Sequence, residues 1–217
     1  MASRRIVFWE VDAQADFLLP GGKLYVPGAE KIIPHIKRLV EAARQSHTLI
    51  VSSADAHSQN DPEFQKFPPH CLKDSPGAKI VPEGMAKRVY VVPNRPKFTL
   101  PPRILDYEQI VLQKQTLDVF DNPHTAKIVK RLGEDVEYFV FGVVTELCVR
   151  CAAKGLLESG RKVALIEDAI ETLKPEDEVK TLNELTAMGA RLLSTERAIE
   201  LAHGYAKNAK APQRASR

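Results

Sequence analysis

Apolar residues cluster in six short runs along the chain, and each run predicts a buried β-strand. The runs are rich in Val, Ile, Leu and Phe and occupy residues 5–13, 47–54, 109–114, 137–144, 162–169 and 191–195. Between them, apolar positions recur at spacings of three and four, which is typical of helices with one buried face. This second pattern predicts helices over residues 28–46, 146–160 and 175–189.

The alternation of strands and helices predicts an α/β fold. Strands that are apolar at almost every position favour a mostly parallel sheet that is covered on both faces. We therefore expect a single three-layer α/β/α domain with a Rossmann-like sheet over residues 5–202, followed by a basic, flexible tail over residues 203–217. The interval 56–108 is rich in proline and too long for an ordinary connection. Long ordered loops in such folds lie at the carboxyl ends of strands, where binding sites form.

Composition narrows the class of protein. The chain has 217 residues, of which 44% are hydrophobic and 27% are charged, and its net charge is only +3. The basic excess lies at the two ends, so we expect no nucleic-acid partner. No apolar run is long enough to cross a membrane, no secretory signal pattern is present, and three cysteines do not make a disulfide framework. These features predict a cytoplasmic protein without a membrane partner and leave a homo-oligomer open.

Two charged side chains follow the ends of predicted strands. Asp12 ends the first strand, where a carboxylate either caps a loop or, with its pKa raised by burial, shuttles a proton. Lys114 ends the strand over residues 109–114, and on the sequence alone it is interpreted as a solvated lysine. If it faces other groups of a site, its ammonium lowers the pKa of a nearby thiol and holds a carboxylate in place.

Potential metal ligands gather after the second predicted strand. Asp55 and His57 are two residues apart, so an extended segment points both side chains in the same direction. Glu63 and His70 follow in a segment that two prolines stiffen. Taken alone, each residue is better explained as an ordinary polar group of a loop than as a metal ligand. Together they favour a divalent metal site with open coordination positions.

Cys148 lies where the strand over residues 137–144 passes into a helix. The first turn of a helix favours a thiolate, and its free N–H groups can bind an oxyanion. Two other interpretations are open, because free cysteine is often simply buried and Cys148 forms a C-x-x-C spacing with Cys151. Cys151 falls one helical turn further on among apolar residues, so core packing is favoured over a disulfide.

These segments, in this order, resemble the isochorismatase-like cysteine hydrolase superfamily and, within it, the nicotinamidases. The resemblance covers nearly the whole chain, from Arg5 to Ala202. "VDAQADF" resembles the opening motif, "DAH" and "FPPHCLKDSPGAKIVP" the metal-binding segment, "KQTLDVF" the lysine motif and "GVVTELCV" the nucleophile motif. It implies hydrolysis of a small aromatic amide through a thioester, with nicotinamide as the expected substrate.

The resemblance also implies a role for individual residues. Asp12, Lys114 and Cys148 correspond to the catalytic triad. A cis peptide bond joins Val143 to Val144, and the oxyanion hole is formed by the N–H groups of Val144 and Cys148.

The implied ligand and substrate contacts come from the remaining motifs. The metal-binding segment supplies ligands for one divalent ion, zinc or else iron or manganese: Asp55, His57 and His70, with Glu63 as a weaker candidate. Phe17 and Phe67 correspond to the walls of the substrate pocket.

The motifs depart from the family pattern at positions outside the triad. They have Ala15, Phe67, Asp74 and Glu146 where Asn, Trp, Gly and Asp are common in the family. The departures therefore bear on the substrate more than on the reaction class. The alternatives are a same-fold cysteine hydrolase for another carboxamide, a carbamoyl compound or isochorismate, a non-catalytic binding member, and a redox protein that uses the C-x-x-C pair.

Overall fold

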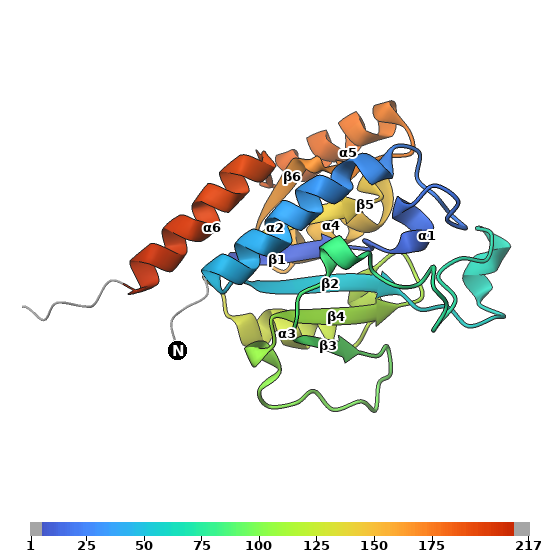
Figure 1. Ribbon diagram of the computed structural model, residues 1–217, viewed down its shortest axis with the longest axis horizontal. Helices are drawn as coiled ribbons and strands as arrows, with labels where there is room; N and C mark the ends of the chain where they lie inside the picture. The colour runs from blue at the N-terminus through green and yellow to red at the C-terminus, as the bar shows by residue number, and fades with distance from the viewer. Residues whose placement is uncertain (1–5, 211–217) are drawn as a thin grey trace, which may run out of the picture.

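A seven-stranded sheet forms the middle layer of the protein in the computed structural model, which describes residues 6–210 (Figure 1). Its strands are β1 (Ile6–Val11), β2 (Leu49–Asp55), β3 (Val89–Val92), β4 (Gln109–Lys114), β5 (Glu137–Val143), β6 (Lys162–Glu171) and β7 (Arg191–Leu193). They pair in the order β3-β4-β2-β1-β5-β6-β7, and every neighbouring pair is parallel. The predicted parallel sheet is therefore confirmed.

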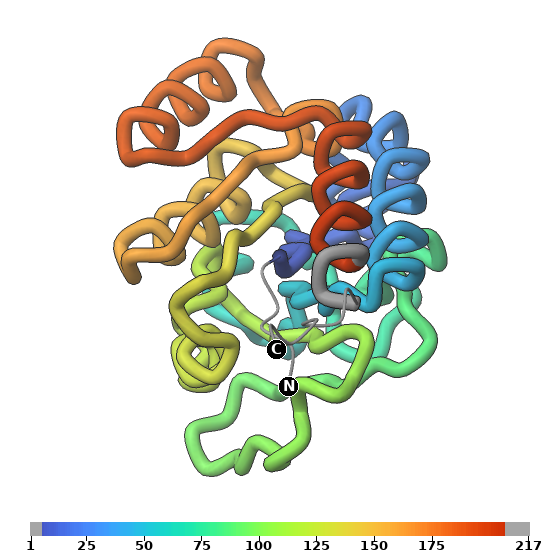
Figure 2. Tube along the Cα trace, turned by 90° about the vertical axis from the view of Figure 1, so that its left-hand side faces the viewer, coloured from blue at the N-terminus to red at the C-terminus, as the bar shows by residue number. Residues whose placement is uncertain are grey.

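Helices cover both faces of the sheet and complete three layers. The helices are α1 (Ala15–Leu18), α2 (Ile33–Ser46), α3 (Thr125–Leu132), α4 (Arg150–Glu158), α5 (Pro175–Ala187) and α6 (Thr195–Lys210). One apolar core joins α2 and α6 to the sheet, and a second core joins α3, α4 and α5 to its other face. Figure 2 shows α2 and α6 side by side, with α4 and α5 across the sheet from them.

Four elements were not singled out from the sequence, and one of them is the four-residue helix α1. Strand β3 lies inside the proline-rich interval at one edge of the sheet, where Val91 is 49% exposed. Helix α3 is short, and helix α6 continues to Lys210. Residue 202, the predicted end of the domain, lies within α6. Residues 211–217 of the predicted tail lie outside the described residues.

The first part of the long interval folds against the carboxyl ends of β1 and β2. The side chain of Gln14 fastens these two ends together, because its Nε2 donates to the Asp55 carbonyl (2.8 Å) and its Oε1 accepts from the Asp55 N–H (2.7 Å). Gln14 Nε2 also donates to the Ala78 carbonyl at 2.7 Å. Asp74 has a φ of 66°, in the left-handed region that favours glycine and tolerates aspartate, so the departure noted there fits a turn.

No helix within residues 6–210 is long and apolar enough to cross a membrane.

A fully buried carboxyl group lies in the middle of the sheet. Glu10 of β1 accepts hydrogen bonds from Ser52 Oγ (2.7 Å) and Gln109 Nε2 (3.1 Å). Burial raises the pKa of Glu10 to about 8, although both hydrogen bonds oppose the shift. Glu10 is therefore protonated in the folded protein at neutral pH.

We expect Glu10→Gln to remove a pH-dependent loss of stability. The unfolded chain releases this proton near pH 4.5 and the folded chain near pH 8, so the free energy of unfolding falls as the pH rises between these values. The slope from this single group is about 1.4 kcal/mol per pH unit. Urea unfolding should be measured from pH 5 to pH 9. The free energy of unfolding of the variant, relative to that of the wild type, should increase with pH up to about pH 8. A stability difference that is the same at every pH, as expected for the exposed control Glu176→Gln, would contradict the assignment.

Gly142 allows β5 to pass very close to β1. Its φ is 119°, and a Cβ at this position would lie 2.0 Å from the carbonyl oxygen of Val11. Only glycine fits there, because both the backbone conformation and the space exclude a side chain.

We expect Gly142→Ala to lower the free energy of unfolding by about 3 kcal/mol or more, because the central strands must move apart. The matched control is Gly160→Ala, since Gly160 also has a positive φ of 72° but has nothing within 4 Å of its added Cβ. The control should cost only about 1 kcal/mol. Urea unfolding measures both, and equal losses would show that backbone conformation alone explains Gly142.

Candidate active site

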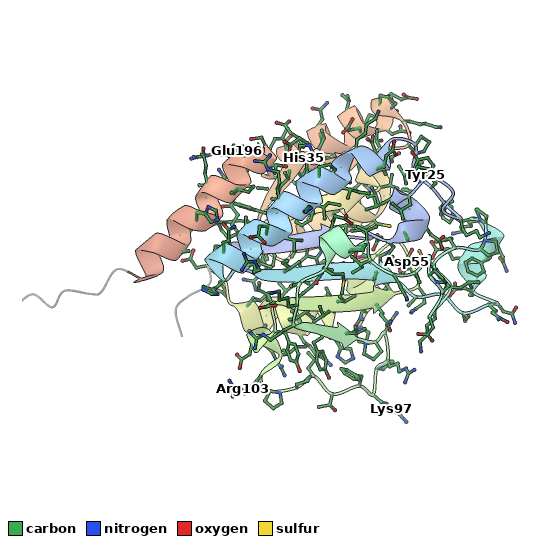
Figure 3. The ribbon with its side chains drawn as sticks, in the orientation of Figure 1. Tyr25, His35, Asp55, Lys97, Arg103 and Glu196 are labelled. Atoms are coloured by element: carbon green, nitrogen blue, oxygen red, sulfur yellow. The ribbon has the colours of Figure 1, made fainter. Side chains whose placement is uncertain are left out.

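Residues predicted from separate motifs meet at the carboxyl ends of neighbouring strands. Asp12 follows β1, Asp55 ends β2, and Lys114 ends β4. Cys148 lies in a π-helical turn, Thr145–Val149, directly after β5. Because β4, β2, β1 and β5 are consecutive in the parallel sheet, these four side chains share one edge. Figure 3 shows Asp55 at this edge, beside the loop that follows β2.

Lys114 lies at the centre of this group. Its Nζ is 2.8 Å from Asp12 Oδ2, 2.5 Å from Asp55 Oδ1 and 3.5 Å from Cys148 Sγ. Its side chain is only 1% exposed. Burial alone lowers the pKa of Lys114, but the two carboxylates outweigh it and hold the pKa well above the ordinary value. The interpretation of Lys114 as a solvated lysine is therefore wrong.

Asp12 is held in an uncommon backbone conformation. Its φ is 48°, and its N–H donates to the Ser53 carbonyl at 3.2 Å. Ser53 Oγ donates to Asp12 Oδ1 at 2.6 Å, which leaves Oδ2 toward Lys114. Burial raises the pKa of Asp12, while the Lys114 ammonium opposes the rise. A carboxyl group in this environment can both accept and return a proton.

The Cys148 thiol is buried, and its sulfur accepts a hydrogen bond from Lys114 Nζ at 3.5 Å. Burial raises the pKa of the thiol well above its ordinary value, and the charges of Asp12 and Asp55 add to the rise against the opposing effect of Lys114. Lys114 does lower the pKa of the thiol, as expected, but burial outweighs this effect and the net shift is upward. Burial therefore favours the protonated form of Cys148, and Lys114 Nζ contacts both this thiol and Asp12.

The peptide bond between Val143 and Val144 is cis, as the resemblance implied. Val144 lies beside Cys148 in the lining of the same cavity. Cys151 lies in α4 and is only partly buried, with its thiol free.

Three of the predicted metal ligands converge on one point. Asp55 Oδ2 is 3.5 Å from His57 Nε2 and 3.5 Å from His70 Nε2. The other ring nitrogens face second partners, since His57 Nδ1 lies 3.1 Å from Asp61 Oδ2 and His70 Nδ1 lies 2.8 Å from the Pro68 carbonyl. Histidine ligands are commonly oriented by a carboxylate or a carbonyl in this way.

These side chains fit a divalent cation. His57 Nε2 is buried, and it makes no hydrogen bond with any described residue. One carboxylate oxygen and two imidazole nitrogens suit zinc, iron or manganese. Burial opposes ionisation of Asp55, but Lys114 and the two histidines hold its pKa below the ordinary value, so the carboxylate is charged. Glu63 Oε2 lies 4.0 Å from His57 Nε2, at the margin of the group.

A small cavity of about 140 Å³ joins the thiol to two of the three converging residues, Asp55 and His70. Cys148 and Val144 line one part of it, and Asp55, Glu63 and His70 line another. This volume is well below the roughly 300 Å³ at which pockets begin to accept drug-sized ligands, so it suits a molecule of about one ring.

The walls of the cavity are mainly apolar. Phe17 and Phe67, both predicted as substrate contacts, are part of its lining. Sequence reasoning missed six further lining residues: Leu24, Tyr25, Val26, Leu117, Leu147 and Leu173. Leu117 lies in the lysine motif and Leu147 in the nucleophile motif, so both had a signal in the sequence, whereas nothing in the sequence marked Tyr25 or Leu173.

Comparison with known proteins agrees with this geometry. The sequence matches the isochorismatase domain over residues 7–100 and 99–197. It is 26% identical over 207 residues to the nicotinamidase of Escherichia coli (strain K12), which covers 84% of this chain and 91% of that protein. The nicotinamidase of Saccharomyces cerevisiae is also 26% identical over 207 residues, covering 82% of this chain and 94% of that protein.

Solved structures give the same result. The structure of the pyrazinamidase of Pyrococcus horikoshii in complex with zinc superposes with a TM-score of 0.71 and 30% identity, covering 88% of this chain and 99% of that one. These relatives hydrolyse amide carbon–nitrogen bonds, and the domain match spans almost all of the described residues. The protein therefore belongs to the isochorismatase family and, within it, to the hydrolases of amide carbon–nitrogen bonds.

Proposed function

We propose that this protein is a metal-containing cysteine amidohydrolase that converts nicotinamide to nicotinate and ammonia. The observation that carries the proposal is a small cavity that joins the buried thiol of Cys148 to Asp55 and His70, with Lys114 contacting both that thiol and Asp12. The names of the two nicotinamidases and the pyrazinamidase among the relatives support an aromatic carboxamide as the substrate.

The cavity offers each part of nicotinamide a suitable neighbour. Phe17 and Phe67 provide aromatic walls for the ring, and Cys148 lies at the part of the cavity where the carboxamide would react. Asp55, His57 and His70 would hold one divalent ion, with Glu63 as a further candidate. When bound, this ion supplies a Lewis-acidic site for the ring nitrogen and so fixes the orientation of the ring.

The first half of the reaction forms a thioester. Asp12 accepts the proton of the Cys148 thiol as the sulfur attacks the carboxamide carbon. The N–H groups of Val144 and Cys148 stabilise the oxyanion, and losing one such donor typically costs about 3 kcal/mol in the transition state. Asp12 then gives its proton to the departing nitrogen, so the carbon–nitrogen bond breaks and ammonia leaves.

The second half hydrolyses the thioester. Asp12, again ionised, takes a proton from a water molecule that attacks the thioester carbon. The carbon–sulfur bond breaks, nicotinate is released, and the proton returns from Asp12 to the sulfur of Cys148. Lys114 holds Asp12 through both halves, since its Nζ lies 2.8 Å from Asp12 Oδ2.

The raised pKa of Cys148 supports proton transfer during attack rather than a permanent thiolate. A buried thiolate beside two carboxylates is unfavourable without substrate. Transfer to Asp12 keeps the total charge of the site constant, and the negative charge then passes to an oxygen that faces hydrogen-bond donors.

We expect Cys148→Ala to abolish ammonia release from nicotinamide, with kcat reduced at least about 1,000-fold, because no other group forms the thioester. Ammonia release should be measured for nicotinamide, pyrazinamide and N-carbamoyl compounds. Circular dichroism should show an unchanged fold, since removing one sulfur atom leaves the backbone of the π-helical turn in place.

The matched control is Cys151→Ala, which should keep wild-type activity because Cys151 lies outside the cavity lining. Equal losses in the two variants would instead favour the redox interpretation of the C-x-x-C spacing. Wild-type enzyme that hydrolyses an N-carbamoyl compound but not nicotinamide would move the proposal to that substrate.

We expect the purified protein to contain about one divalent metal ion per chain, measured by elemental analysis. His70→Ala should lower the metal content severely, since His70 Nε2 is one of the three converging donors. The control His35→Ala changes a histidine of α2 outside this cluster and should leave the metal content unchanged. Metal-free protein with full activity on nicotinamide would refute the metal site.

A further inference from the structure

The connection between β6 and α5 forms part of the cavity wall. Leu173 lies in this connection, and it lines the cavity together with Val144, Leu147 and Cys148. At the same time Leu173 is 48% exposed. An apolar side chain that is half in solvent is only weakly held by its own packing, so another contact must keep it over the cavity.

That contact is a carboxylate from the turn that carries the nucleophile. Glu146 Oε1 accepts a hydrogen bond from the backbone N–H of Leu173 at 3.0 Å, and Glu146 Oε2 accepts one from Thr172 Oγ1 at 2.7 Å. Thr145 Oγ1 adds a third link by donating to the Glu171 carbonyl at 2.9 Å. Two successive residues of the π-helical turn therefore hold the connection at the mouth of the cavity.

Glu146 lies near two other carboxylates, those of Glu171 and Glu178. Burial raises the pKa of Glu178, and the neighbouring carboxylates Glu171 and Glu146 add to the rise. Repulsion between like charges opposes an acidic residue here. The hydrogen bonds to Thr172 and Leu173 are charge-assisted and offset that cost.

We propose that Glu146 is a positioning residue that holds Leu173 over the cavity, and that Leu173 thereby favours substrates with an aromatic ring. The inference rests on the proposed function for the identity of the substrate. The hydrogen bonds of Glu146 to Leu173 and Thr172 do not depend on that function. Glu146 touches no reacting atom in this scheme. It acts through Leu173, which provides an apolar surface against the face or edge of the bound ring.

The first test separates binding from chemistry. Leu173→Ala should raise the KM for nicotinamide about tenfold while kcat changes less than about threefold, because the lost contact is apolar and Leu173 takes no part in the bond-making steps. Glu146→Ala should give a similar KM effect. Glu146→Gln should restore a near-wild-type KM, since the amide oxygen still accepts from the Leu173 N–H and the amide nitrogen can donate to Thr172 Oγ1.

The second test asks whether the two residues act together. If Glu146 works through Leu173, the double variant Glu146→Ala/Leu173→Ala should have the KM of Leu173→Ala alone. The proposal would be overturned if the increase in KM of the double variant were the product of the two single increases. It would also be overturned if Glu146→Ala lowered kcat and left KM unchanged. Glu176→Ala is the matched control, because Glu176 is an exposed glutamate in the first turn of α5 and should leave both constants unchanged.

A third measurement does not depend on the substrate. Hydrogen exchange at the Leu173 amide should become faster in Glu146→Ala and remain slow in Glu146→Gln. Unchanged exchange in Glu146→Ala would refute the positioning role. Wild-type enzyme that is inactive on nicotinamide would refute the proposed substrate alone, and the KM comparison would then use whichever amide of the panel is hydrolysed.

Discussion

The organisation of the site depends on one buried ammonium between two buried carboxylates. Lys114 contacts Asp12 and Asp55 through a single nitrogen atom, and all three side chains are at most 5% exposed. A charge this deeply buried is tolerated only when it is paired and hydrogen-bonded, so removing Lys114 would leave two buried carboxylates without a cation. Asp12 faces the thiol and Asp55 faces two histidines, and Lys114 therefore joins the proposed catalytic half of the cavity to its proposed metal half.

Burial also decides the state of the nucleophile. It raises the pKa of the Cys148 thiol, and the charges of Asp12 and Asp55 add to the rise, whereas Lys114 opposes it. The proton acceptor and the positive charge are thus arranged around a neutral sulfur. A helix start and a neighbouring lysine, considered separately, predict a thiolate. This prediction leaves out burial and the carboxylates that other strands supply.

Much of the fold was predictable because the central strands are apolar at nearly every position. Strands β1 and β5 lie in the middle of the sheet and are buried along almost their whole length, so their sequence pattern is strong. Strand β3 was missed because it is a short edge strand, where half-exposed positions and a following proline weaken the pattern. The end of α6 was missed because a basic composition was interpreted as a tail, whereas the helix continues to Lys210.

By itself the sequence determined which chemical groups are present and at which strand ends they lie, because parallel strands bring their carboxyl ends to one edge of the sheet. Asp12, Lys114 and Cys148 were identified in this way from separate motifs. Only the tertiary structure decided how these groups affect one another, since burial and distances between strands set each pKa. It alone also revealed the contact of Glu146 with Leu173, because hydrogen bonds between residues 27 positions apart leave no periodic pattern in the sequence.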